Sequence, residues 1–136
     1  MPWVDEEMNS SVIVRNSKIH GKGVFARREI KKGEVVIDWS SCSKVLNKKE
    51  VDVLSENKKR LVSYQGSGKY VLFHSPGRYI NHSCDSNTKA IRGRDVAVRN
   101  IKKGEEITAD YIAEKVPGLN LQCKCGSKKC KGRIKF

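Results

Sequence analysis

Segments that would place a chain in or across a membrane are missing from this sequence. Its 136 residues hold no apolar run long enough to cross a bilayer, and no targeting or secretion signal is recognisable in them. These absences exclude the membrane-spanning and secreted classes. We therefore expect one soluble, intracellular domain with no membrane partner.

Acidic residues are scarce beside basic ones, with 15 Asp and Glu against 28 Lys and Arg. The formal net charge is +13, and the sequence pI is about 9.7. Such a surface attracts polyanions such as nucleic acid, nucleoprotein or acidic proteins. The alternative is a soluble basic surface with no dedicated partner. Hydrophobic residues make up 38% of the chain, so its core is modest and a bound metal would add to its stability.

The five cysteines form an odd-numbered set, which disfavours a disulfide framework in a chain without a secretion signal. Cys123, Cys125 and Cys130 are closely spaced, with small and charged residues between them. This spacing favours a zinc site over free buried thiols, but zinc needs four ligands. Cys84 is a candidate for the fourth, and it would bring the tail onto the middle of the chain. Cys42 is isolated, and we expect it to be an ordinary thiol.

Short apolar stretches separated by glycines predict a mainly β domain. Residues 1–10 have little periodicity and are expected to form an N-terminal arm. A helix is expected over residues 48–62, with Asn47 as its N-cap. Strands are expected at residues 12–14, 24–26, 35–37, 70–73, 95–99 and 107–109.

Residues 30–34 and 101–105 share the sequence Ile-Lys-Lys-Gly-Glu. Each copy precedes an apolar strand and places a glycine, Gly33 or Gly104, where a tight turn can need positive φ. The echo is too short for a structural repeat. It indicates the same turn used twice.

Five segments follow one another along the chain: GKGVF at 21–25, GEVV at 33–36, RYINHSCDSN at 78–87, GEEITADY at 104–111 and CKCGSKKC at 123–130. Taken in this order, they resemble the SET-domain family of protein lysine methyltransferases, in which the last segment is known as the post-SET tail. The run at 78–87 is specific, whereas a lone Gly-x-Gly is weak evidence. The resemblance divides the chain into an arm (1–10), a SET domain (11–112) and a post-SET zinc-binding tail (113–136).

The resemblance implies a β-clip-like fold of small sheets, in which the Asn-His-Ser-Cys segment and the C-terminal part form a pseudoknot. It implies S-adenosylmethionine as methyl donor, with donor and lysine entering from opposite faces. It also implies one structural Zn²⁺ held by Cys84, Cys123, Cys125 and Cys130. A lysine must lose its proton before it can attack, and an apolar channel favours that loss.

By the same resemblance, Tyr111 is the catalytic residue, with its hydroxyl near the transferred methyl group. The residues expected to bind the donor are Gly21, Lys22, Gly23, Arg78, Asn81, His82 and Tyr111. Structural alternatives remain for His82, as a core histidine, and for Arg78, as a surface ion pair. Ile134 and Phe136 are expected to cover the adenine or, equally, to make a simple tail contact.

Trp39 and Ala109 are expected in the substrate channel, where they depart from the family pattern. Trp39 stands where the family commonly has tyrosine, and Ala109 where many members have Phe or Tyr. Ala109 implies a roomier pocket or space that Trp39 fills.

The acceptor is expected to be a lysine of a histone or chromatin-like protein, associated with nucleic acid through the basic surface. Because the chain itself is so basic, the cleft should be locally acidic. The candidates for its acidic groups are Asp85, Glu105, Glu106 and Asp110. The competing hypotheses are a catalytically weak, zinc-stabilised nucleic-acid-binding module and a scaffold that binds donor or methyllysine without turnover.

Overall fold

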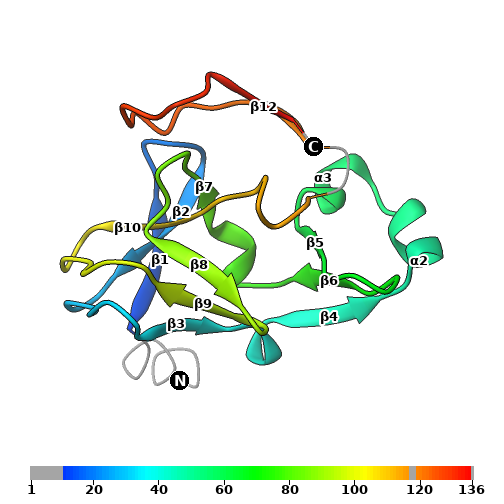
Figure 1. Cartoon of the computed structure of the whole chain (residues 1–136), viewed down its shortest axis with the longest axis horizontal. Helices are drawn as coiled ribbons and strands as arrows, with labels where there is room; N and C mark the ends of the chain where they lie inside the picture. Colours follow the sequence, from blue (N-terminus) through cyan, green and yellow to red (C-terminus); the bar gives the residue numbers. More distant parts are fainter. Residues whose placement is uncertain (1–10, 117–118, 136) are drawn as a thin grey trace.

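The computed structural model describes residues 11–116 and 119–135. The expected arm and Phe136 lie outside these residues. Figure 1 shows a body of small twisted sheets, with the C-terminal hairpin lying along one side of it. Within the described part, no helix has the length and apolar character needed to cross a membrane.

Four small sheets make up the fold, which confirms the mainly β prediction. The first has the order β1 (Val12–Asn16), β2 (Lys22–Ala26), β10 (Glu106–Ala109), β7 (Asn81–His82). The second has the order β3 (Val35–Asp38), β9 (Arg94–Ala97), β8 (Thr88–Ile91). The third has the order β4 (Ser43–Leu46), β6 (Tyr70–Phe73), β5 (Val62–Tyr64), and the tail hairpin pairs β11 (Asn120–Gln122) with β12 (Arg133–Lys135).

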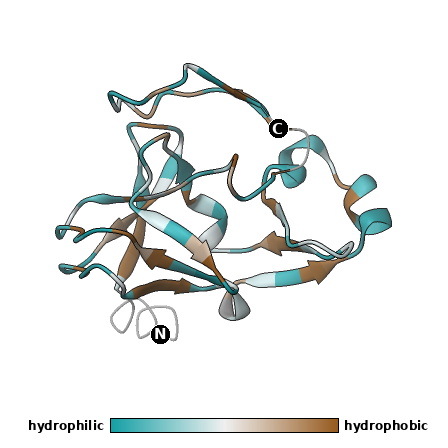
Figure 2. Cartoon of the chain, in the orientation of Figure 1, coloured by the Kyte–Doolittle hydropathy of each residue, from teal (hydrophilic) through white to brown (hydrophobic). Residues whose placement is uncertain are grey.

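The main core lies between the first two sheets and includes Val24, Ile30, Ile101 and Ile107, which are at most 1% exposed. Figure 2 shows the hydrophobic residues concentrated on strands such as β3 and β9, whereas the helices are mostly hydrophilic. Burial of such side chains stabilises each by about 1.5–3 kcal/mol relative to exposure. The tail has a separate, smaller cluster around Val116, Leu119, Cys123 and Ile134.

The repeated Ile-Lys-Lys-Gly-Glu turn is confirmed as one turn used twice. Gly33 has φ +92° and Gly104 has φ +87°. The two copies also pair with each other, because Ile30 and Ile101 exchange both backbone hydrogen bonds, at 2.8 and 2.7 Å. The two turns therefore lie side by side, with Ile30 and Ile101 both buried in the main core.

The single helix expected over residues 48–62 is wrong. The structure has two short helices, α2 (Lys48–Asp52) and α3 (Glu56–Lys59), followed by β5. Asn47 does cap α2, and it forms a capping box with Glu50. Ser55 ends the helical run because its side chain caps α3 by accepting a hydrogen bond from Lys58 N. Short 3-10 turns occupy Trp39–Ser41 (η1) and Gly77–Tyr79 (η2).

Strand β7 brings the Asn-His-Ser-Cys segment against the C-terminal part of the chain. It runs parallel to β10, with Asn81 beside Thr108 and His82 beside Ala109. Ser83 N then donates to Ala109 O at 3.0 Å. This pairing supplies the contact that the predicted pseudoknot requires.

Candidate functional site

Two cavities meet beside β7 and β10. The larger has a volume of about 680 Å³, and the smaller about 30 Å³. Four residues line both, namely Arg60, Leu61, Arg78 and Tyr111. Arg78 also places its guanidinium over the Tyr79 ring, 5.1 Å from the centroid.

The larger cavity is walled by three segments that are distant in sequence. Residues 19–22 precede and begin β2, Asn81 and His82 form β7, and residues 120–124 belong to the tail. Gly21 and Lys22 therefore lie in the wall, as does Arg133 of β12. Ile134 is instead 1% exposed within the tail cluster, which favours the simple tail contact.

The side chain of Asn81 fixes the loop that carries Gly21 and Lys22. Its Nδ2 donates to His20 O at 3.1 Å and to Lys22 O at 3.0 Å. It also lies 2.8 Å from Glu106 Oε2 and 3.1 Å from Ser17 Oγ. Asn81 therefore shapes the wall of the larger cavity.

Gly23 is required by close packing in this same region. A Cβ at Gly23 would lie 2.3 Å from Glu106 Oε2 and 3.0 Å from Ser17 Cβ. Ser17 Oγ in turn donates to Glu106 at 2.7 Å, which anchors the loop to β10. Any other residue at position 23 would displace this network.

Tyr111 stands at the junction of the two cavities, and its hydroxyl donates to Ile80 O. Its backbone N–H donates to His82 Nδ1 at 3.0 Å. Burial, and then the charge of Glu114, raise the pKa of Tyr111, so the phenol stays protonated. Burial also lowers the pKa of His82, although Asp110 opposes the shift. His82 is thus a neutral, buried positioning group.

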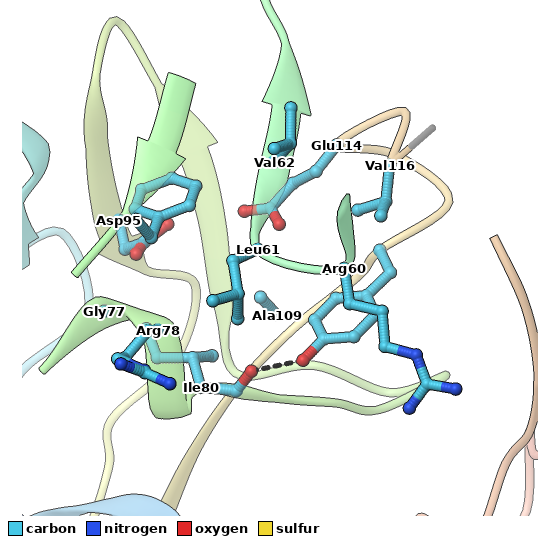
Figure 3. Close-up of a pocket in the computed structure, with 12 residues that line it drawn as sticks. Arg60, Leu61, Val62, Gly77, Arg78, Ile80, Asp95, Ala109, Glu114 and Val116 are labelled. Carbon is cyan, nitrogen blue, oxygen red and sulfur yellow. Dashed lines mark hydrogen bonds between the residues drawn. The ribbon is translucent and has the colours of Figure 1, made fainter. Parts of the chain in front are cut away.

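The smaller cavity is lined mainly by apolar groups of β5, β6 and β10, including Ala109. Two carboxylates also line it, from Asp95 of β9 and Glu114 of the segment after Tyr111. Figure 3 shows Glu114 reaching in beside Val62 and Leu61, with Asp95 on the other side.

Burial changes the protonation of both of these carboxyl groups. It raises the pKa of Asp95 to about 6, against the effect of the Trp39 indole. Burial, followed by the charges of Asp95 and Asp110, raises the pKa of Glu114 to about 8.

Trp39 lies behind this cavity and does not line it. The indole is 3% exposed and packs edge-on against Phe73, with ring centroids 4.9 Å apart. Phe73 and Ala109 do line the cavity. Trp39 therefore bounds the channel through Phe73.

None of the four acidic candidates for the acceptor cleft lines either cavity. Asp85 pairs with Arg99 and Lys129, each at 3.7 Å. Glu105 and Glu106 are engaged by turn and loop hydrogen bonds. Asp110 caps the following turn.

Asp95 and Glu114 escaped the sequence prediction for different reasons. In the strand expected at 95–99, Asp95 and Ala97 face the core, whereas Val98 is 37% exposed. The signal in the sequence that could have found Asp95 was a charged residue at the start of the apolar run at 96–98. Glu114 lies in a turn with no periodic pattern, and nothing in the sequence marked it.

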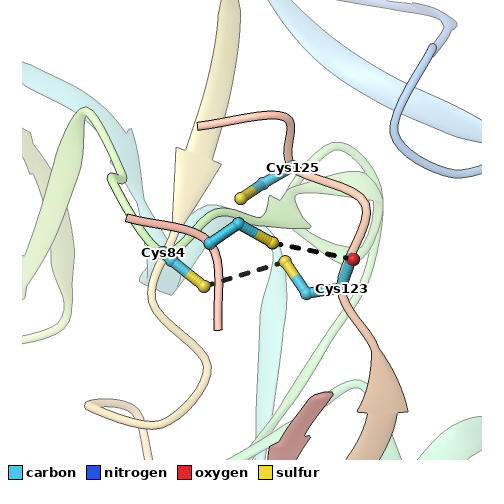
Figure 4. Close-up of side chains that lie close together, drawn as sticks. Cys84, Cys123 and Cys125 are labelled. Carbon is cyan, nitrogen blue, oxygen red and sulfur yellow. Dashed lines mark hydrogen bonds between the residues drawn. The ribbon is translucent and has the colours of Figure 1, made fainter. Parts of the chain in front are cut away.

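Four thiols gather where the tail meets Cys84, two residues after the end of β7, and Cys42 is not among them. The Sγ atoms of Cys84, Cys123, Cys125 and Cys130 all lie within 4.8 Å of one another. Cys84 Sγ is 3.7 Å from Cys123 Sγ (Figure 4). The predicted grouping of these four cysteines is confirmed.

The donor set fits a tetrahedral zinc ion. Zn–S bonds of about 2.3 Å place ligand sulfurs about 3.8 Å apart, close to the Cys84–Cys123 separation. Lys131 N also donates to Cys84 Sγ at 3.3 Å, as suits a thiolate. Burial raises the pKa of Cys123, whereas, against the effect of burial, hydrogen bonds from Ser127 lower the pKa of Cys125. A cation would therefore be needed to ionise all four together.

Comparison with known proteins gives the family. The SET domain profile matches residues 21–112. The chain is 32% identical to Histone-lysine N-methyltransferase 2B of Homo sapiens, over 89% of the chain and 5% of that protein. It is 34% identical to Histone-lysine N-methyltransferase SET9 of Gibberella zeae, over 91% of the chain and 19% of that protein.

A third relative is Histone-lysine N-methyltransferase trithorax of Drosophila virilis, at 30% identity over 93% of the chain and 4% of that protein. The chain therefore spans less than a fifth of the length of each of these three relatives. The profile match covers more than half of the chain and includes β2, β7, β10 and Tyr111. The chain belongs to the SET-domain family.

Proposed function

We propose that the protein is a protein-lysine N-methyltransferase that uses S-adenosylmethionine. The observation that carries this proposal is the meeting of a large and a small cavity at Tyr111. A donor in one cavity and a lysine side chain in the other would bring their reacting atoms together there. Such positioning can supply several kcal/mol of the rate enhancement.

The larger cavity suits the donor. Its volume of about 680 Å³ lies within the usual range for cofactor sites. The donor, when bound, supplies a methyl group on a positively charged sulfur. The residues proposed to hold it are Gly21, Lys22, Gly23, Arg78, Asn81, His82 and Tyr111. The absence of a side chain at Gly23 keeps the Ser17–Glu106 network, and so this wall, in place.

The smaller cavity suits the end of a lysine side chain. Ala109 lines this cavity, and Trp39 packs behind it against Phe73. These two residues are proposed to set how many methyl groups the amine can carry. Tyr111 is proposed as the catalytic residue because its hydroxyl, held by Ile80 O, faces the junction. Its protonated state suits it to orient the amine and the methyl group by hydrogen bonding.

The tail is proposed as a separate structural unit, residues 113–136, that follows a SET domain of residues 11–112. Zn²⁺ held by Cys84, Cys123, Cys125 and Cys130 would fix it to the body. Because residues 120–124 line the larger cavity, the metal would also complete the donor site.

The acceptor is proposed to be a lysine of a histone or a similar chromatin-like protein inside the cell. The three relatives described above are named as histone-lysine N-methyltransferases. The net charge of +13 supports association with an acceptor already bound to nucleic acid. Rates that fall with added salt would report this association.

The direct test is label transfer. Zinc-loaded protein is incubated with methyl-labelled S-adenosylmethionine and core histones, with and without DNA, and lysine Nζ is examined by mass spectrometry. Methyllysine is the expected product. Donor binding without label in any acceptor, including the protein itself, would contradict the proposal and favour a binding module.

A further inference from the structure

Two carboxylates face the smaller cavity without a basic partner. Asp95 is only 3% exposed, and its Oδ1 accepts no hydrogen bond. Within residues 11–116 and 119–135, the ion pairs at 4.0 Å or less involve neither Asp95 nor Glu114. A buried carboxylate without a basic partner is costly, so its presence in a cavity points to a cationic ligand.

The backbone of Glu114 is held firmly. Asp110 Oδ1 accepts hydrogen bonds from the N–H groups of Ile112, at 2.9 Å, and Ala113, at 3.3 Å. Glu114 N donates to Asp110 O at 3.1 Å. Ser63 Oγ of β5 donates to Glu114 O at 2.9 Å. The turn therefore directs the Glu114 side chain to the cavity from a fixed point.

Asp95 is placed by the sheet. It sits in the middle strand β9, opposite Ile37 of β3 and Ala90 of β8. A register shift in β3 between Val35 and Ile37 accompanies this pairing. Strand β9 thus turns Asp95 inward, toward the cavity that Glu114 enters from the opposite side.

We propose that Glu114, with Asp95 beside it, receives the ammonium group of the acceptor lysine and removes one proton from it before methyl transfer. In this step one Nζ–H bond breaks, its electron pair stays on Nζ, and the proton bonds to a carboxylate oxygen of Glu114. The products are a neutral amine and a neutral carboxylic acid, and the proton later passes to solvent. This inference rests on the proposed function.

The surroundings make that transfer feasible. In water the proton would stay on lysine, because the reference pKa values of lysine and glutamate differ by about 6 units. Burial raises the pKa of Glu114 to about 8, and the charges of Asp95 and Asp110 add to the effect. The same apolar surroundings, together with the positive charge of a bound donor, lower the pKa of a bound lysine against the opposing effect of the carboxylates. A neutral pair is therefore favoured over two buried charges.

The other charged or titratable groups that face the pair are few. Arg60 and Arg78 line the cavity without forming an ion pair with either carboxylate. Tyr111 is kept neutral by burial and by Glu114, and Asp110 adds negative charge. A cavity of about 30 Å³ also has room for a group the size of water or ammonium.

The experiment compares pH–rate profiles of the wild type with those of Glu114→Gln and Asp95→Asn, using labelled S-adenosylmethionine and core histones. Glu114→Gln should lower kcat by about 100-fold or more, the scale of general-base catalysis. The pH–rate profile should fall on its acid side as Glu114 becomes protonated. Asp95→Asn should move this acid limb of the profile to lower pH, because loss of the neighbouring charge lowers the pKa of Glu114. The exposed Glu29 provides the matched control, and Glu29→Gln should retain the wild-type profile.

Binding of S-adenosylhomocysteine and Tm show whether each variant is folded. If Glu114→Gln does not fold, Glu114→Asp replaces it, and it should keep an acid limb at a reduced rate. NMR of the Glu114 carboxyl carbon gives a readout without substrate, with titration expected near pH 8 in the wild type and lower in Asp95→Asn.

Each outcome decides a different claim. Wild-type kcat with an unchanged acid limb in Glu114→Gln, or titration of Glu114 near its ordinary value of about 4.3, would overturn the inference alone. A wild-type protein that binds donor but labels no acceptor would overturn the proposed function and this inference with it.

Discussion

The two cavities that meet at Tyr111 are built by different means. The larger has walls from the segment before β2, from β7 and from the tail, so distant segments must be brought together. The smaller lies among strands of the packed body and contains two carboxylates. The walls of the smaller cavity form when the body of the protein folds, whereas those of the larger cavity also require the tail to be attached.

Because of this difference, the two cavities should be sensitive to different substitutions. Loosening the tail should damage the larger cavity and leave the smaller one formed. Changing Asp95 or Ala109 should alter the smaller cavity and leave donor binding intact. The two sides of Tyr111 can therefore be disabled independently.

Among the changes that act on one side of Tyr111, the largest effect on donor binding is expected from the metal site. Cys84→Ser removes one of four clustered thiols, so bound zinc should fall from one per chain to near zero. Affinity for S-adenosylhomocysteine should fall about 10–100-fold, because the tail wall loses its attachment. Elemental analysis measures the zinc content, and calorimetry measures the affinity for S-adenosylhomocysteine.

Cys42→Ser is the matched control for the metal site, since Cys42 lies apart from the cluster. It should keep both zinc and affinity. A zinc-free protein with full activity would show that the metal has no part in the donor site.

Gly23→Ala should have the next largest effect. The new Cβ would lie 2.3 Å from Glu106 Oε2, so the Ser17–Glu106 network must shift at a cost of about 1–3 kcal/mol. Donor affinity should fall about 10-fold, as measured by calorimetry and denaturant unfolding. Lys44→Ala is the control, because its side chain is exposed on β4 and lines neither cavity. Equal effects of the two substitutions would count against close packing at Gly23.

Asp95→Asn should increase stability at high pH. Since burial raises the pKa of Asp95 from 3.8 to about 6, the folded state binds the extra proton between these values. Stability from this group therefore falls as pH rises from about 4 to 6. At pH 8 the variant should be more stable by about 1–2 kcal/mol, with the difference vanishing near pH 4. Denaturant unfolding at both pH values tests this, and a pH-independent difference would contradict it.

The smallest effect is expected from Ala109→Phe. A larger side chain at this lining position narrows the smaller cavity. The highest methylation state should drop by one while the first transfer continues, as read by mass spectrometry of the product. An unchanged distribution of methylation states would show that Ala109 does not set the room for methyl groups.

Much of this arrangement could be predicted where local chemistry dictates it. Cys84 and the three tail cysteines share a chemistry that brings them together, and Gly33 and Gly104 take the positive φ that their turns need. The specific run around Asn81 led to the family, which the profile match confirms.

The rest depended on tertiary context that a local pattern does not contain. The expected long helix broke because Ser55 could cap a second one. Asp95 faces inward because of how β9 pairs within its sheet. Glu114 reaches the cavity through a turn held by Asp110 and Ser63, residues 4 and 51 positions away.

The central claim is that Tyr111 joins a donor cavity to an acceptor cavity for methyl transfer. Tyr111→Phe keeps the ring but removes the hydroxyl that is bonded to Ile80 O. Single-turnover label transfer and S-adenosylhomocysteine affinity, measured together, test the claim. We predict a loss of about 100-fold or more in rate with affinity changed less than about threefold, because the lost contact acts in the transition state. A near-normal rate would contradict the account.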